Sequence, residues 1–132
     1  MSVGDSATPL GRVRGLGPSR HGGEHWLADK VTSLALLLLG AWLIASLLWL
    51  PSLDRASVLE WLRAPSGALP MALFIVAAFR HGLDGLKVVV DDYVHDEGNR
   101  FALNTLLLFL AVGGGALALF SLARIAFGGA AA

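Results

Sequence analysis

The sequence predicts an all-α integral membrane protein with three transmembrane helices. Of its 132 residues 55% are hydrophobic and only 15% are charged, and the mean hydropathy is +0.66. A soluble domain of this size carries more charge to cover its surface. The apolar residues are also grouped into long runs, as a helix needs if it is to cross the hydrocarbon core with about 20 mostly apolar residues.

The first segment, residues 1–30, is a polar tail that leads to the membrane. It is rich in Gly, Ser and Pro and has no apolar run, so it cannot bury much surface. No apolar core follows its early charges as in a cleavable signal peptide. We expect irregular backbone as far as about Asp29, with a short amphipathic stretch near His25 and with Trp26 at the lipid interface.

The first predicted span, residues 31–50, contains twenty residues without a charge. Pro51 ends it, and Trp49 marks its far interface. The loop that follows, residues 51–67, is charged. Within it, residues 56–63 are expected to form a short interfacial helix whose Trp61 enters the lipid.

Two further spans are predicted at 69–90 and 101–127, followed by a short C-terminal tail, 128–132. The second span is apolar in its first half and charged in its second half. The third contains the run Gly113–Gly115, which would let a neighbouring helix or a flat cofactor approach closely. Because glycine weakens a helix, a local kink is also expected there.

The loop charges predict the orientation of the chain in the membrane. Cytoplasmic loops are enriched in Lys and Arg, and the N-terminal segment has more of them than the first loop. This places the N-terminus and the second loop in the cytoplasm and the C-terminus outside. The cations of the N-terminal segment are Arg12, Arg14, Arg20 and Lys30.

Composition also excludes several kinds of site. The net charge is zero, so there is no overall electrostatic case for nucleic acid. Cysteine is absent, so this chain can form no disulfide, iron–sulfur ligand set or thiolate zinc site.

Charged residues inside the second span make it the candidate functional element, because such residues usually face a bundle interior, a cavity or a cofactor. Spacings of four, three and four residues place one set on a single helix face. Opposite charges at these spacings can pair, which would make the set a structural ladder. Its members are Arg80, Asp84, Lys87 and Asp91.

A second stripe of the same helix carries His81, Gly85, Val88 and Asp92. A neutral imidazole can bind iron without burying a charge. Gly85, one turn from His81, removes the side chain that would block a planar macrocycle. The alternative is a hydrogen-bonded structural histidine. If His81 does bind haem iron, a sixth ligand has to come from another chain.

Asp91, Asp92 and Tyr93 end the second span. A tyrosine hydroxyl can donate a hydrogen bond to a quinone carbonyl, and a neighbouring carboxylate can orient it or relay a proton. The alternative is an interfacial tyrosine beside helix-end acids. Two acids at a helix C-terminus oppose its dipole, so Arg100, His95 or a partner's cations are expected to compensate them.

The run from His81 to His95 resembles the second-helix motif of the hydrophobic membrane anchor (D) subunits of succinate dehydrogenase, the succinate:quinone oxidoreductase of respiratory complex II. In that motif a haem-ligating His is followed eleven residues later by Asp-Tyr. Residues 15–17 (Gly-Leu-Gly), 24–27 (Glu-His-Trp-Leu) and 31–32 (Val-Thr) also resemble the stretch before the family's first helix.

The resemblance implies roles for individual residues. His81 would be an axial ligand of haem b, shared with a second anchor subunit of the cytochrome b556 type. Tyr93, with Asp92 beside it, would bind ubiquinone. Lys30 stands where the family often has an Arg near a haem propionate, although Lys lacks the bidentate fork of Arg. The two residues before Lys30, Ala28 and Asp29, depart from the polar pair expected there.

The resemblance also implies partners and a location. An iron–sulfur subunit and a flavoprotein subunit would dock on the cytoplasmic face, with succinate oxidation in those partners and electrons passing to ubiquinone. The three helices would complete a bundle with the second anchor subunit. The expected location is a bacterial inner membrane.

Three alternatives remain open from the sequence. The chain could anchor a fumarate reductase or another quinone reductase. It could be a small homo-oligomeric transporter that uses Asp84 or Arg80 in a membrane pathway. It could be an insertion or assembly factor, which would leave the spacing from His81 to Tyr93 without a reason. Co-purifying subunits would distinguish these classes.

Overall fold

The computed structural model describes residues 22–128, and in that part of the chain it contains four helices and no strand. They are α2 (Gly22–Trp49), α3 (Arg55–Arg63), α4 (Pro65–Tyr93) and α5 (Glu97–Phe127). The all-α prediction is therefore confirmed. The tail ahead of Gly22 and the last four residues lie outside the described range.

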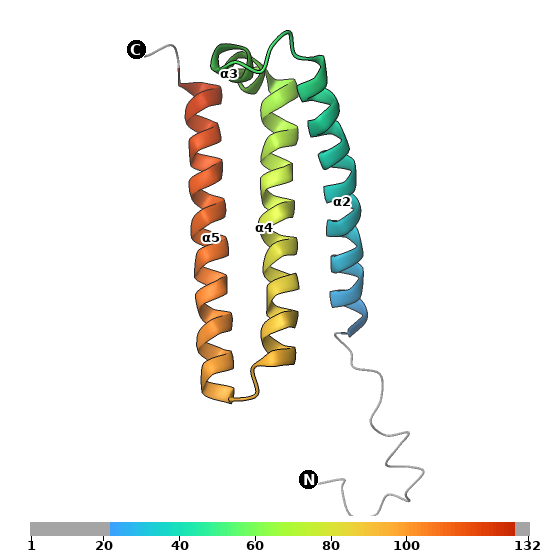
Figure 1. Cartoon of the computed structure of the whole chain (residues 1–132), viewed down its shortest axis with the longest axis vertical. Coiled ribbons are helices and arrows are strands. Elements are labelled where there is room, and N and C mark those ends of the chain that lie inside the picture. Colours follow the sequence, from blue (N-terminus) through green and yellow to red (C-terminus); the bar gives the residue numbers. More distant parts are fainter. Residues whose placement is uncertain (1–21, 129–132) are drawn as a thin grey trace, which may run out of the picture.

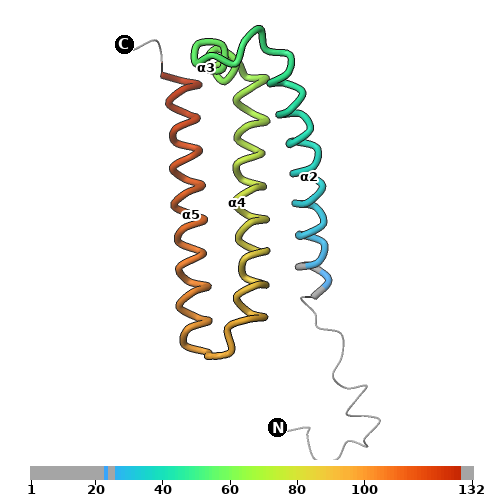
Figure 2. Tube along the Cα trace, viewed as in Figure 1, coloured from blue at the N-terminus to red at the C-terminus, as the bar shows by residue number. Residues whose placement is uncertain are grey.

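The three long helices lie side by side in one row (Figures 1 and 2), with α4 in the middle. Helix α4 contacts both α2 and α5, whereas α2 and α5 do not contact each other over their described lengths. The short helix α3 lies across one end, where it contacts α4 and α5. The N-terminal end of α2 and the hairpin between α4 and α5 lie at the other end. A single row leaves two broad faces of α4 uncovered.

The structure supports two or three membrane spans. Helices α2 and α5 are each long and apolar enough to cross a bilayer, and α4 qualifies together with α3, from which it is bent by 88°. Most large apolar side chains are exposed, as expected where lipid and protein partners provide the apolar surroundings. Among the described residues, the buried apolar side chains are Ala77, Leu83 and Leu122.

Each long helix extends beyond the apolar run that predicted it. Helix α2 begins at Gly22, so the irregular backbone expected as far as Asp29 is wrong from Gly22 onward. Helix α4 begins at Pro65, where the missing N–H is harmless, and α5 begins behind Asp96, whose side chain accepts the N–H of Asn99 at 2.8 Å. Hydropathy locates the apolar part of a helix and not the polar turns that continue it.

The corner between α3 and α4 depends on one glycine. A Cβ at residue 67 would collide with the backbone carbonyl of Trp61, so only Gly67 allows this turn of α4 to lie against the end of α3. The expected short helix is present, but the indole of Trp61 stacks on Trp42 of α2, with 5.6 Å between ring centroids. Trp61 thereby ties the corner to α2.

The glycine run in α5 allows the expected close approach. The ring of Phe79 on α4 lies against Gly114 and Gly115. The helix nevertheless continues unbroken through the run to Phe127, because the packed neighbour compensates for the weak helix propensity of glycine.

Candidate functional site

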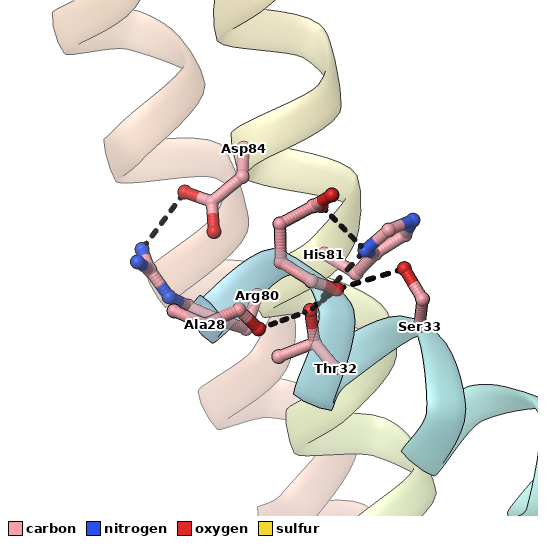
Figure 3. Close-up of polar contacts among 7 residues, drawn as sticks. Ala28, Thr32, Ser33, Arg80, His81 and Asp84 are labelled. Carbon is pink, nitrogen blue, oxygen red and sulfur yellow. Dashed lines mark hydrogen bonds and ion pairs between the residues drawn. The ribbon is translucent and has the colours of Figure 1, made fainter. Parts of the chain in front are cut away.

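His81 lies on the side of α4 that faces the first turns of α2 (Figure 3). Its Nδ1 is 3.3 Å from the hydroxyl oxygen of Thr32 and 3.4 Å from Oδ1 of Asp29. His81 thus stands beside the polar beginning of α2 rather than its apolar run. The charged half of α4 begins at this contact. The polar residues at the start of α2 therefore provide polar neighbours for it.

The hydrogen-bond network assigns the tautomer of His81. The hydroxyl of Thr32 lies 3.0 Å from the backbone carbonyls of Ala28 and Asp29, so its single hydrogen is directed to the backbone of α2. Its oxygen can therefore only accept from His81, and a carboxylate can only accept as well. Both neighbours of Nδ1 are acceptors, which places a ring hydrogen on Nδ1; in the neutral ring, the lone pair is then on Nε2.

This arrangement fits an axial haem ligand. Metal-binding histidines commonly donate their other N–H to a carboxylate or carbonyl, and within residues 22–128 the second ring nitrogen of His81 has no hydrogen-bond partner. A Cβ at Gly85 would meet nothing within 4 Å, so the surface one turn from His81 is open to a flat group. Within residues 22–128, no three His, Asp or Glu side chains gather to hold an ion. A haem brings its own ring nitrogens and needs only one such side chain at each axial position.

The charged ladder is only partly formed. Nη1 of Arg80 is 3.0 Å from Oδ1 of Asp84, which confirms that pair. Asp84 is buried, and Figure 3 shows the pair pointing away from the contact between His81 and Thr32. Lys87 makes no ion pair within the described residues. Asp91 instead accepts a hydrogen bond from the side chain of Asn104, at 2.9 Å.

Asp92 and Tyr93 form the last turn of α4 and are both exposed, Tyr93 by 79%. They lie about 16 Å (Asp92) and about 18 Å (Tyr93) along the helix axis from His81, so the structure does not bring the two predicted sites into contact. The two neighbouring acids have different surroundings. The amide of Asn104 on α5 holds Asp91, whereas Asp92 has no hydrogen bond or ion pair to the part of the chain that the structure describes. Asp91 is therefore compensated by the neutral amide of Asn104, and not by the expected cation.

Lys30 is exposed on α2, and its Nζ lies 5.9 Å from the ring centroid of Trp26, in cation–π range. It follows Asp29 directly, but consecutive helix residues point about 100° apart, so it does not join the contact with His81. Its role toward a propionate stays a prediction.

An apolar groove of about 340 Å³ lies along the seam between α4 and α5. Its α4 lining lies both before and after His81 in the sequence, and no residue of α2 lines it. Its lining consists of Ala78, Phe79, Gly82, Leu83, Leu86, Leu107, Leu110 and Ala111.

Three polar residues of these contacts were not predicted from the sequence. Asp29 and Thr32 are three positions apart in the sequence, so they share a helix face. This polar face at the start of the apolar run was the signal available in the sequence. Asn104 gave a weaker signal as an isolated amide in the third span. One of its polar atoms, Oδ1, is buried and unpaired.

Comparison with known proteins finds one family and relatives that carry the same name. Residues 4–121 match the family described as "Succinate dehydrogenase/Fumarate reductase transmembrane subunit". Proteins named "Succinate dehydrogenase hydrophobic membrane anchor subunit" are similar along most of their length. The one from Paracoccus denitrificans is 27% identical over 92% of this chain and 93% of its own. The one from Rickettsia conorii is 28% identical over 82% of this chain and 84% of its own. The one from Rickettsia bellii is 26% identical over 79% of this chain and 81% of its own.

Proposed function

The chain belongs to the family of succinate dehydrogenase and fumarate reductase transmembrane subunits, and we propose that it is the hydrophobic membrane anchor subunit of a succinate dehydrogenase. In this role it docks the flavoprotein and iron–sulfur subunits and holds haem b together with a second anchor subunit. It also forms part of the ubiquinone site. Succinate is oxidised in the partner subunits, and this chain provides the place where electrons reach quinone.

The observation that carries the proposal is the state of His81. Its Nδ1 faces two acceptors on α2, its Nε2 has no hydrogen-bond partner within residues 22–128, and the Gly85 position one helix turn away is open. Haem bound there would supply one-electron chemistry. The contribution of the chain is to hold the imidazole in one tautomer and one orientation and to keep a flat surface next to it.

Tyr93 and Asp92 support the quinone part of the proposal. Both are exposed at the end of α4, where a soluble partner can cover them. A tyrosine hydroxyl there can donate to a quinone carbonyl while the free carboxylate of Asp92 orients it. The distribution of Lys and Arg favours a cytoplasmic position for this end, where the partner subunits would bind. The membrane proposed is a bacterial inner membrane.

Of the alternatives, a fumarate reductase anchor falls within the same family. The three similar curated proteins described above are named for succinate dehydrogenase, which favours that reading. The transporter reading used Asp84 or Arg80 in a membrane pathway. Arg80 and Asp84 neutralise each other, which removes the charges on which that reading depended.

The proposal is tested by purifying the tagged chain from its native membrane in a mild detergent. The expected result is co-purification of a flavoprotein, an iron–sulfur subunit and a second hydrophobic subunit, with succinate-dependent ubiquinone reduction in the same fraction. Recovery of a self-assembly of this chain alone, without that activity, would overturn the proposal.

A further inference from the structure

We infer that Asp29, acting together with Thr32, is a positioning residue that sets the electron-donating strength of His81 toward iron. The inference rests on the proposed haem function and adds a residue to it. The contact between Thr32 and His81 joins α2 to α4 across 49 positions of sequence.

Thr32 provides the direct acceptor. Its hydroxyl oxygen is 3.3 Å from Nδ1 of His81, and its hydrogen is directed to the α2 backbone at 3.0 Å. A hydroxyl held in this way cannot turn round to donate. Thr32 therefore fixes the direction of the Nδ1–H bond and the plane of the imidazole.

Asp29 provides the charge. Its Oδ1 lies 3.4 Å from Nδ1, longer than an ordinary hydrogen bond but close enough for the carboxylate charge to act on the ring, and both side chains are only partly exposed. A carboxylate next to the Nδ1–H polarises the ring and raises the basicity of Nε2. A more basic axial nitrogen stabilises ferric iron relative to ferrous iron, so Asp29 is expected to lower the haem midpoint potential.

The experiment measures that potential by redox titration of the haem absorbance in the intact purified complex. Asp29→Asn keeps the size of the side chain and removes its charge. The expected result is a rise equivalent to roughly a tenfold change in the ferrous-to-ferric ratio, which is 59 mV for one electron. Thr32→Val keeps the shape and removes the acceptor, so we expect a shifted or broadened ferric low-spin electron paramagnetic resonance signal.

Two matched variants control for indirect effects. Ser33→Ala removes a hydroxyl from the same turn, one that bonds the Asp29 backbone carbonyl at 2.8 Å and does not contact His81. Glu97→Gln removes an exposed carboxylate from the start of α5, at the same end of the row of helices. Neither is expected to change the potential or the resonance signal.

The outcomes separate the inference from the function on which it rests. A wild-type complex without haem b would overturn both. If the wild-type complex contains haem b and the Asp29→Asn complex has the same haem midpoint potential, the inference alone is overturned. If Asp29→Asn loses haem, Asp29→Glu keeps the charge and is expected to restore it; failure to restore haem would contradict the inference.

Discussion

Arg80 and Asp84 form an ion pair of 3.0 Å one helix turn apart, and the two partners are buried to very different extents: the side chain of Arg80 is 50% exposed and that of Asp84 only 8%. Removing one member of such a pair leaves the other charge unpaired. Arg80→Leu should therefore destabilise the fold more than Asp84→Leu does. The expected loss for Arg80→Leu is about 3 kcal/mol, the lower end of the range for buried pairs because the guanidinium is already half solvated.

The double variant Arg80→Leu/Asp84→Leu should regain most of this loss, since it leaves no unpaired charge. The free energies of unfolding can be compared by titrating the purified chain with sodium dodecyl sulfate in mixed micelles. Additive losses in the double variant would show that the pair does not couple the two residues.

The glycines of α5 provide a second test. A Cβ at Gly114 would come within 2.8 Å of the Phe79 ring, whereas one at Gly113 would meet nothing within 4 Å. Gly113→Ala should stabilise α5 by up to about 1 kcal/mol through helix propensity alone. Gly114→Ala should gain less, because the ring has to move, and Gly114→Val should cost roughly 1–3 kcal/mol as overpacking. Thermal unfolding in detergent measures the difference; equal effects at both positions would contradict the packing of Phe79 on α5.

The cap of α3 predicts a pH dependence outside the membrane spans. The hydroxyl of Ser52, followed by the hydroxyl and backbone N–H of Ser57, lowers the pKa of Asp54 below its ordinary value of 3.8. A lowered folded-state pKa means that this stabilisation is complete above the ordinary value and is lost as pH falls through the lowered one. The fluorescence of Trp61, stacked on Trp42, should report this acid transition. Asp54→Asn, which still caps the helix, should abolish it; an unchanged transition would locate it elsewhere.

The two acids at the end of α4 should differ in function. Asp92→Asn should lower the rate of ubiquinone reduction, whereas Asp91→Asn should leave it nearly unchanged, because Asp91 already accepts a hydrogen bond from Asn104. Both variants should keep their haem and their succinate oxidation with an artificial acceptor. Equal losses in the two variants would mean that the adjacent acids act as a unit.

Tyr93→Phe isolates the hydroxyl of the proposed quinone site. Loss of one hydrogen bond of about 1.4 kcal/mol should lower quinone reduction roughly tenfold. Haem content should not change, because Tyr93 is about 18 Å along α4 from His81. An unchanged quinone rate would remove Tyr93 from the site.

The apolar runs of the sequence were enough to predict the three long helices and the short helix between the first two, since apolar run length is a direct physical requirement of the bilayer. They could not show that α2 begins at Gly22, because polar turns at the end of a helix have no hydropathy signal. They also could not show that the helices form an open row. Which helices touch depends on side-chain contacts such as those of Phe79 with Gly114.

For the site, helical spacing was enough to separate His81 from the stripe of Arg80 and Asp84, because periodicity fixes which residues share a face. The partners of His81 could not be predicted, since Asp29 and Thr32 are on another helix. For the same reason, the predicted charge ladder along α4 was only partly right: it gave Asp91 a partner on its own helix. The partner of Asp91 is Asn104 of α5 and not Lys87, and only the packing of α4 against α5 reveals it.

The most direct test of the account is a dithionite-reduced minus oxidised absorbance spectrum of the gently solubilised complex, with wild-type chain and with His81→Ala. The account predicts a b-type haem signal in the wild type and its loss or strong disturbance in His81→Ala. Succinate oxidation with an artificial acceptor should be retained in both. An identical haem signal in His81→Ala, or a complete wild-type complex without haem b, would contradict it.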